Sequence, residues 1–518
     1  MPANSATLGI DIGTSSCKAL LLDESGAVLA THSVAYDVAA PRPGWSEQDP
    51  ESWVAGARAA ISGLLAKRPS VKISAIGLSG QMHGLTALDE AHKVLRPAIL
   101  WNDQRNAAEC AEITEAVGGL PRLLAETNNR MLPGYTGGKI LWMRKHEPDL
   151  FRRMRHILNP KDYLRLCLTG EAATEVSDAS GTGLFDVRQR RWSKAVIDAI
   201  GLDERMLPSC YESDVVSGRV SAGAARLFGL EEGIPVVGGG GDSVIQTIGS
   251  GVIDPGDLQT TIGTAGILAC ALDKPRDNPD GRLQVFCNVA ADRWHCMGVS
   301  LNAGGALSWL RSVAHGFGDL SEAGWHDIPF ERFMERAAES PAGARGLVFL
   351  PYLNGERCPY PDPEARGAFL GLTSRHNESD MIRSVLEGVV FALRDIFSLM
   401  AEAGIEARRL RASGGGAASA FWRQIQADIF GCDVVTTEGA AEGGAFGAAI
   451  VAGVGTGLWP DAAAAARVCK PVSRQSPQPA TQAIYERMFD TYKELYPLLR
   501  TSFSKLCDPI YDAEEVAA

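Results

Sequence analysis

Near its start the chain places a carboxylate beside small residues, where phosphate chemistry could use them. The apolar run LGIDI contains Asp11 and is followed at once by Gly13, Thr14 and Ser15. A carboxylate at a strand end can meet a hydrated cation, and the N–H groups of a Gly-Thr turn can cradle an anion. Lys18, in the next apolar run, would add positive charge. The alternative is an ordinary hairpin turn beside a surface aspartate.

A shorter echo of this stretch recurs in LQTTIGTAGIL at residues 258–268, where Gly263 and Thr264 form a second Gly-Thr turn. Alone, it would be interpreted as a β-turn. Two such hairpins in one chain indicate an internal duplication, in which each copy offers a phosphate loop. The first stretch is not a P-loop, because the pattern G-x-x-x-x-G-K-[ST] is absent and no helix follows its glycine.

Four consecutive glycines, 238–241, separate the predicted strand IPVV from Asp242. Glycines bury no side chain and lose much conformational entropy on folding, so close approach of a ligand explains them best. Asp242 begins a predicted helix. It is there either a reactive carboxylate or the helix N-cap, and the two roles are compatible.

Other candidates lie at predicted strand ends, where α/β proteins bind ligands. Met82 and His83 lie in a turn between two strands, and Trp101 and Asp103 follow the apolar run AIL. A sugar-like ligand needs several donors and acceptors and often an aromatic wall. The alternatives are a loop histidine and a core tryptophan.

Glycine-rich turns at 304–305 and 414–416 precede predicted helices. Small residues there would let a flat ring approach the backbone, although plain turns are the alternative.

The elements that must position these residues follow from the hydrophobic pattern. Alternating apolar residues predict strands at 7–12, 17–22 and 27–35, and a helical stripe runs through 46–68. The pattern restarts after the break DPGD at 254–257. The sequence therefore predicts two mixed α/β domains.

Composition excludes several classes. The chain has 518 residues, 45% of them hydrophobic, and a formal charge of -12, which argues against nucleic-acid or anionic-membrane binding. Eleven scattered cysteines without a C-x-x-C pair indicate a reduced, cytoplasmic setting. Nine dispersed histidines disfavour a zinc site, and no apolar run reaches the ~18 residues of a membrane span.

Many motifs in order give the chain a family resemblance over about residues 8–455. It resembles the FGGY carbohydrate kinases, most closely their xylulokinase branch. The motifs that carry this resemblance are GIDIGTSSCK, GWSEQDPESW, IGLSGQMHG, ILWNDQR, LPGYTGGKILWMRKHEP, LNPKDYLRLCLTGE, SDASGTGLFDV, GGGGD, LPYLNGERCPYPDPEARGAFLGL, LEGVVFALRD and GGGAASAFWRQIQADIFG.

The resemblance implies two actin-like (ribonuclease H-like) domains flanking a deep catalytic cleft. Residues 1–253 would form the sugar-binding side and residues 254–518 the nucleotide-binding side. The substrates would be a small sugar and ATP, with Mg²⁺, and the family includes homodimers.

The resemblance also implies roles for single residues. Asp242 matches the catalytic base, and Asp11 matches the acid that, with Asp242, is associated with the metal. Met82 and His83 match sugar-contacting positions. The positions that match the phosphate loops or nucleotide contacts are Thr14, Ser15, Gly263, Thr264, Gly304, Gly415 and Ser419.

One position departs from the xylulokinase pattern. Ser243 stands where that branch usually carries an asparagine that touches the sugar. The expected reaction is ATP-dependent phosphorylation of D-xylulose to D-xylulose 5-phosphate, and the open alternative is a kinase for ribulose, an alditol or a tetrose derivative. A more distant alternative is an actin-like ATPase or chaperone, and another is an inactive sugar sensor.

Overall fold

The computed structural model describes residues 5–278, 280–316 and 329–507, and the chain divides into two compact units. Unit 1 comprises Met1–Pro255, Ala271–Cys296 and Glu438–Lys470, and unit 2 comprises Gly256–Cys270, Met297–Thr437 and Pro471–Ala518. Each unit contains a mixed β-sheet with helices against it, which confirms the predicted α/β class. The division of family domains at 253/254 stays a prediction.

The sheet of unit 1 begins with the predicted strand–turn–strand and runs in the order β13-β14-β5-β1-β2-β3. β1 pairs antiparallel with β2 and parallel with β5, and β14 and β15 also lie parallel to β5. The carboxyl ends of these parallel strands therefore meet at one edge. The bounds are β1 Ser5–Ile12, β2 Ser16–Leu22, β3 Val28–Ala35, β5 Lys72–Gly80, β13 Val216–Arg219, β14 Pro235–Val237 and β15 Gly240–Gly241.

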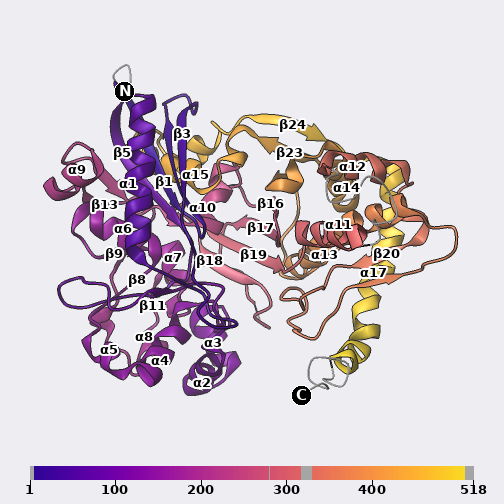
Figure 1. Cartoon of the computed structure of the whole chain (residues 1–518), viewed down its shortest axis with the longest axis horizontal. Helices are drawn as coiled ribbons and strands as arrows, with labels where there is room; N and C mark the ends of the chain where they lie inside the picture. The colour runs from indigo at the N-terminus through magenta and orange to yellow at the C-terminus, as the bar shows by residue number, and fades with distance from the viewer. Residues whose placement is uncertain (1–4, 279, 317–328, 508–518) are drawn as a thin grey trace. The chain divides into compact units, whose positions relative to one another are not determined.

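Helix α1, Pro50–Lys67, covers one face of this sheet (Figure 1). It starts after Asp49, whose side chain accepts the N–H of Glu51, inside the stretch predicted to be helical. Its apolar stripe joins Ile10, Ile12 and Cys17 in a buried core.

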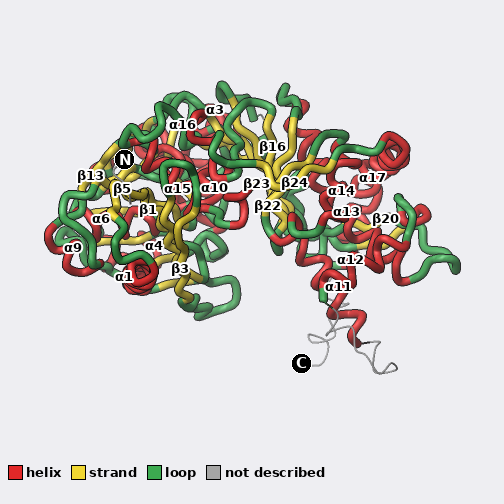
Figure 2. Tube along the Cα trace, turned by 90° about the horizontal axis from the view of Figure 1, so that it is seen from above, coloured by secondary structure: helices red, strands yellow, loops and turns green. Residues whose placement is uncertain are grey.

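Helix α15, Gly444–Gly455, covers the opposite face, as the view from above shows (Figure 2). Two strand glycines let its backbone come close. A Cβ on Gly9 would lie 1.9 Å from the carbonyl oxygen of Ala445, and one on Gly77 would lie 2.0 Å from that of Ala448. Any side chain at either glycine would push α15 off the sheet.

The sheet to which the strands of unit 2 belong repeats this plan, with the order β18-β19-β17-β16-β22-β23-β24, in which β18 is Gln284–Cys287. β16 pairs antiparallel with β17 and parallel with β22, and β22 lies parallel to β23. Each sheet then ends on an antiparallel edge strand, β13 in unit 1 and β24 in unit 2. This common topology supports the predicted duplication. The bounds are β16 Asp257–Ile262, β17 Gly266–Leu272, β19 Trp294–Ser300, β22 Arg409–Ser413, β23 Val434–Thr437 and β24 Pro471–Gln475.

Helices α13 and α14 pack on this second sheet. Leu393 of α13 lies against Gly266 of β17, and the Thr260 hydroxyl of β16 donates to the Gln426 side chain of α14 at 2.7 Å. The helices of unit 2 are α11 Gly304–Gly316, α12 Phe330–Glu339, α13 Glu378–Glu402, α14 Ala420–Phe430 and α17 Pro479–Leu506, and a further hairpin joins β20 Val348–Leu350 to β21 Ala368–Leu370.

Smaller elements complete unit 1. Its further helices are α2 Ala107–Val117, α3 Leu120–Thr127, α4 Thr136–His146, α5 Pro148–Arg153, α6 Pro160–Thr169, α7 Val176–Ser180, α8 Lys194–Ala199, α9 Ala222–Phe228, α10 Asp242–Gly249 and α16 Ala462–Ala466. Its further strands are β4 Glu47–Gln48, β6 Thr86–Leu88, β7 Ala98–Ile99, β8 His156–Leu158, β9 Ala173–Glu175, β10 Phe185–Asp186, β11 Arg191–Trp192, β12 Ser209–Tyr211 and β18 Gln284–Cys287. Among all described helices, none combines the length and the apolarity needed to cross a bilayer.

The contact between α15 and the sheet predicts the effect of one substitution. Gly77→Ala should lower the free energy of unfolding by about 2 kcal/mol or more, because its new methyl group meets backbone atoms that cannot rotate away. Urea denaturation measures this. Gly223→Ala on α9 is the matched control, since the nearest atom to its Cβ lies 3.9 Å away, and it should leave stability unchanged or raise it. Equal stability of Gly77→Ala and wild type would contradict the close packing.

Candidate active site

The register of three strands in unit 1 brings the two predicted carboxylates together. Asp11 of β1 lies beside Ser79 of β5, which in turn lies beside Gly240 of β15. Two residues beyond Gly240, Asp242 begins α10. Asp11 and Asp242 thus lie at the shared carboxyl edge of neighbouring strands, where ligands bind in α/β sheets.

Asp11 is half-buried and receives partial compensation for its charge. The Ser79 hydroxyl donates to its Oδ1 at 2.7 Å, and Lys18 is its cross-strand partner in β2. The first residue of α15 also lies close, since a Cβ on Gly444 would be 2.8 Å from that Oδ1. Burial raises the pKa of Asp11, and Ser79 and Lys18 lower it in part.

Asp242 is the first residue of α10 and is not its N-cap, a position that Gly241 occupies. Its Oδ1 accepts the N–H of Ser243 at 2.6 Å. Burial, and then the negative charge of Asp11, raise the pKa of Asp242 to about 7. The two carboxylates therefore interact, and one of them titrates near neutral pH.

A buried polar network holds the glycine strand that leads to Asp242. Arg165 of α6 donates to the carbonyl oxygens of Val237 and Gly238, at 3.0 and 2.7 Å. The Ser177 hydroxyl of α7 accepts the N–H of Gly241 at 3.0 Å. The segment is thus fixed by hydrogen bonds to its backbone, which need no side chains on the glycines.

A group of buried ion pairs is connected to this network. Lys161 is fully buried and pairs with Asp162 at 2.6 Å, Asp178 at 3.2 Å and Glu175 at 3.4 Å. Glu175 in turn accepts the Ser177 hydroxyl at 2.8 Å. Burial and the neighbouring carboxylates raise the pKa of Asp178 well above its usual range.

Met82 lies against the two residues that flank Asp242 in the chain. A Cβ on Gly241 would come within 2.5 Å of Met82, and the Ser243 hydroxyl lies 2.9 Å from the Met82 sulfur. His83 adopts a left-handed backbone, with φ of 70°, and its Nδ1 donates to the Gly181 carbonyl oxygen at 2.6 Å. Of the predicted sugar residues, Met82 thus lies beside the predicted base, and His83 follows Met82 in the chain.

The first Gly-Thr loop closes as the predicted hairpin, with the Gly13 N–H donating to the Ser16 carbonyl oxygen at 3.0 Å. Trp101 donates its indole N–H to the Thr14 hydroxyl at 3.0 Å, and Ser15 is exposed. Trp101 therefore lies against the predicted phosphate loop. Lys18 forms an ion pair with Glu442 at 3.2 Å.

Asp103 is fully buried, and both of its carboxylate oxygens have partners in its own surroundings. One oxygen accepts the Ser46 N–H at 2.6 Å, and Arg105 donates to both oxygens at 2.7 and 2.8 Å. This aspartate fixes the loop that carries Trp101.

Two glycine-rich turns of unit 2 lie against a third, the turn between β16 and β17. The Gly304 N–H donates to the Gly263 carbonyl oxygen at 2.8 Å, and a Cβ on Gly304 would lie 2.6 Å from that oxygen. Gly414 and Gly416 lie against Ile262, the residue before this turn. Gly263, Thr264, Gly304 and Gly415 thus gather at the carboxyl end of β16.

Ser419 stands at the start of α14, four residues after Gly415. Its hydroxyl accepts the N–H of Trp422 at 3.2 Å, as an N-cap does.

Several residues that shape the site escaped the sequence analysis. Ser79, Arg165 and Ser177 act through hydrogen bonds to residues distant in sequence, which no local pattern reveals. The glycine pair at the start of α15 was a usable signal, because Gly443, its N-cap, has φ of 60° and Gly444, its first residue, lies beside Asp11.

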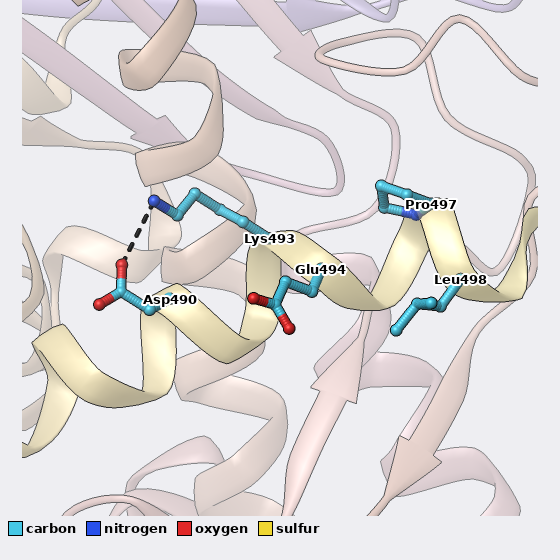
Figure 3. Close-up of a pocket in the computed structure, with 5 residues that line it drawn as sticks. All are labelled: Asp490, Lys493, Glu494, Pro497 and Leu498. Atoms are coloured by element: carbon cyan, nitrogen blue, oxygen red, sulfur yellow. Dashed lines mark ion pairs between the residues drawn. The ribbon is translucent and has the colours of Figure 1, made fainter.

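A hollow elsewhere, on the surface of unit 2, is lined by residues of a single helix, α17 (Figure 3). These residues are Asp490, Lys493, Glu494, Pro497 and Leu498, and Lys493 pairs with Asp490 at 3.3 Å. It contains none of the predicted site residues.

Comparison with known proteins agrees with this arrangement. A model of the N-terminal domain of the FGGY family of carbohydrate kinases matches residues 6–249, and one of the C-terminal domain matches residues 258–456. The chain is 37% identical to the xylulose kinase of Escherichia coli K12 over 494 residues, which are 95% of this chain and 99% of that protein.

Two solved structures extend the comparison. A crystal structure titled as a xyloylose kinase from Brucella ovis has a TM-score of 0.88 and 37% identity, and covers 96% of this chain and 99% of its own. The gluconate kinase from Lactobacillus acidophilus has a TM-score of 0.89 and 27% identity, and covers 97% and 99%.

Proposed function

The chain belongs to the FGGY family of carbohydrate kinases, which are ATP-dependent sugar phosphotransferases, and we propose that its acceptor is D-xylulose, converted to D-xylulose 5-phosphate. The assignment of the site rests on one observation. Asp11 and Asp242 lie near each other at the same sheet edge, so that the charge of Asp11 raises the pKa of Asp242, and Met82 lies beside Asp242. The choice of sugar is supported by the identity to xylulose kinases along most of the chain.

We propose Asp242 as the general base. In the transfer, a sugar oxygen forms a bond to the γ-phosphorus, the bond from that phosphorus to ADP breaks, and the hydroxyl proton must leave. A carboxylate whose pKa is raised to about 7 accepts this proton more readily than an ordinary aspartate and is still ionised in part at neutral pH.

The two carboxylates also suit a magnesium ion. Mg²⁺ keeps several waters and uses one or two carboxylates besides phosphate oxygens. Asp11 and Asp242 form such a donor pair, and the described residues hold no group of three or more metal-ligating side chains that would suit a fully enclosed ion. When bound, Mg²⁺ would neutralise charge on the β- and γ-phosphates.

We assign the two Gly-Thr turns to phosphate binding. In unit 1, Thr14, Ser15 and Lys18 supply hydroxyl, N–H and ammonium donors. In unit 2, Gly263 and Thr264 are exposed, and their carbonyl oxygens accept N–H groups from the first residues of α11. Gly304, Gly415 and Ser419 would contact the nucleotide, since glycines there leave room for a flat ring.

Met82, His83, Trp101 and Asp103 are proposed for the sugar side, with Asp103 acting through the loop that it fixes. A kinase for another ketose or polyol is the second candidate, and one contact favours it. The Ser243 hydroxyl is directed at the Met82 sulfur, 2.9 Å away, and is shorter than the amide usual in the xylulokinase branch. The acceptor side of this site thus differs in shape.

The setting that we propose is the cytoplasm. All eleven cysteines lie in the described part of the chain and none of them forms a disulfide there. Seven of the eleven are buried, which supports a reducing compartment.

Asp242→Asn should lower kcat by roughly 10²–10⁴-fold, because the base is lost, while ATP binding stays near wild type. Coupled ADP-release assays and isothermal titration with ATP measure the two effects. Asp11→Ala should also lose activity, but should regain part of it at raised Mg²⁺, unlike Asp242→Asn. Asp149→Asn, at an exposed carboxylate, is the control. Near-normal turnover by Asp242→Asn would show that another group is the base.

The acceptor is tested with a panel of D-xylulose, D-ribulose, alditols and tetrose derivatives in the same assay. We expect the highest kcat/KM with D-xylulose. Ser243→Asn should change the ranking within the panel more than it changes the KM for ATP, because Ser243 lies on the Met82 side. A higher kcat/KM for another acceptor would replace D-xylulose and keep the kinase assignment.

A further inference from the structure

Lys139 is a fully buried lysine in the first turns of α4, close to the predicted sugar residues. Its ammonium group donates to two backbone carbonyl oxygens, that of His83 at 2.8 Å and that of Gly134 at 2.5 Å. The Thr136 hydroxyl donates to the same His83 oxygen at 3.1 Å. A buried cation thus holds two backbone carbonyl groups, and one of them belongs to the loop that carries Met82 and His83.

The loop residue that Lys139 holds has an uncommon conformation. His83 has φ of 70°, a left-handed backbone that side-chain-bearing residues seldom adopt. Its ring is fixed by the Gly181 carbonyl oxygen at 2.6 Å and lies 4.8 Å from the Tyr135 ring. Without the donors on α4, the half-buried carbonyl oxygen of His83 would lose these two hydrogen bonds.

The position of this charge is unfavourable for folding alone. A cation near the N-terminus of a helix opposes the helix dipole. Within the described part of the chain, no carboxylate lies within ion-pair distance of Lys139, and Asp103 acts on it only from further away. A charge kept where it costs stability indicates a role in the site.

We propose that Lys139 is a positioning residue for the acceptor sugar: its ammonium group holds the His83 carbonyl and so presents Met82 and His83 to the sugar. This inference rests on the proposed kinase function for its consequence, but the contact itself does not. Lys139 touches neither nucleotide loop, so its removal should affect sugar binding and leave ATP binding intact.

The surroundings of Lys139 make its hydrogen bond to the His83 carbonyl oxygen sensitive to pH. Burial lowers the pKa of Lys139 to about 7, against the opposing effect of Asp103. The other groups that face it are Cys110 of α2, whose pKa is raised to about 12, Arg105, and His83 itself. Below pH 7 the ammonium form donates strongly to the carbonyl oxygens, and above pH 7 the neutral amine donates weakly. Sugar affinity should therefore fall as pH rises through 7.

The test compares wild type with Lys139→Met, which keeps the length and removes the donors, and Lys139→Gln, which keeps a neutral N–H. Lys145→Met is the matched control, since Lys145 lies on the same helix and pairs with Glu109 and Glu112. D-xylulose binding without nucleotide, ATP binding and melting temperature are measured between pH 6 and 9. Amide hydrogen exchange of residues 80–86 is measured in parallel.

The proposal predicts about tenfold weaker sugar binding by Lys139→Met at pH 6, a smaller loss in Lys139→Gln, and unchanged ATP binding. Exchange of residues 80–86 should quicken in both variants. The loss of affinity that wild type shows above pH 7 should be smaller in Lys139→Met. Asp242 titrates in the same range in all four proteins, so only the difference between them reports on Lys139.

Two results would overturn the proposal. One is a Lys139→Met protein with wild-type sugar affinity, exchange and pH dependence. The other is a parallel loss of sugar binding, ATP binding and melting temperature in both variants, which indicates a purely structural lysine. If wild type binds no D-xylulose, the acceptor assignment fails, and the exchange data still decide whether Lys139 holds the loop.

Discussion

The constraint that the fold of unit 1 must satisfy is the mutual repulsion of two half-buried carboxylates. Asp11 and Asp242 each lose hydration on folding, and the charge of one raises the pKa of the other. Such a pair opposes folding unless other contacts hold it. The register of β1, β5 and β15 provides that support, because it fixes both residues through backbone hydrogen bonds.

The surrounding residues make sense as responses to this constraint. Ser79 and Lys18 offset the charge of Asp11, and the start of α15 lies beside it. On the side of Asp242, hydrogen bonds from Arg165 and to Ser177 hold the glycine strand. A strand held by its backbone can carry glycines, and Gly241 lets Met82 approach the backbone next to Asp242. The same carboxylates that strain the fold are then available as a base and as metal ligands.

Local patterns predicted the elements well. The hairpins at both Gly-Thr turns, the helix within 46–68 and the helix that begins at Asp242 were all expected, because alternation, turn residues and capping act over a few residues. The family resemblance also predicted the two-domain α/β class, and the family models confirm it.

Long-range features could not be predicted from these patterns. The place of α15 on β1 and β5 depends on Gly9 and Gly77, which have the sequence pattern of ordinary strand residues. Ser79 and Lys139 act on groups far away in sequence, one through a carboxylate and one through a backbone carbonyl. A lysine inside the apolar stretch around α4 was the available signal, since a buried lysine needs partners.

The central claim is that Asp11 and Asp242 repel each other within the folded protein. A double-mutant cycle in unfolding free energy tests it most directly, with wild type, Asp11→Asn, Asp242→Asn and the double variant at pH 8 in a chelating buffer. We predict that each single variant is more stable than wild type, and that the double variant gains less than the sum, with a coupling of about 1 kcal/mol. Additive changes, or single variants less stable than wild type, would contradict the account.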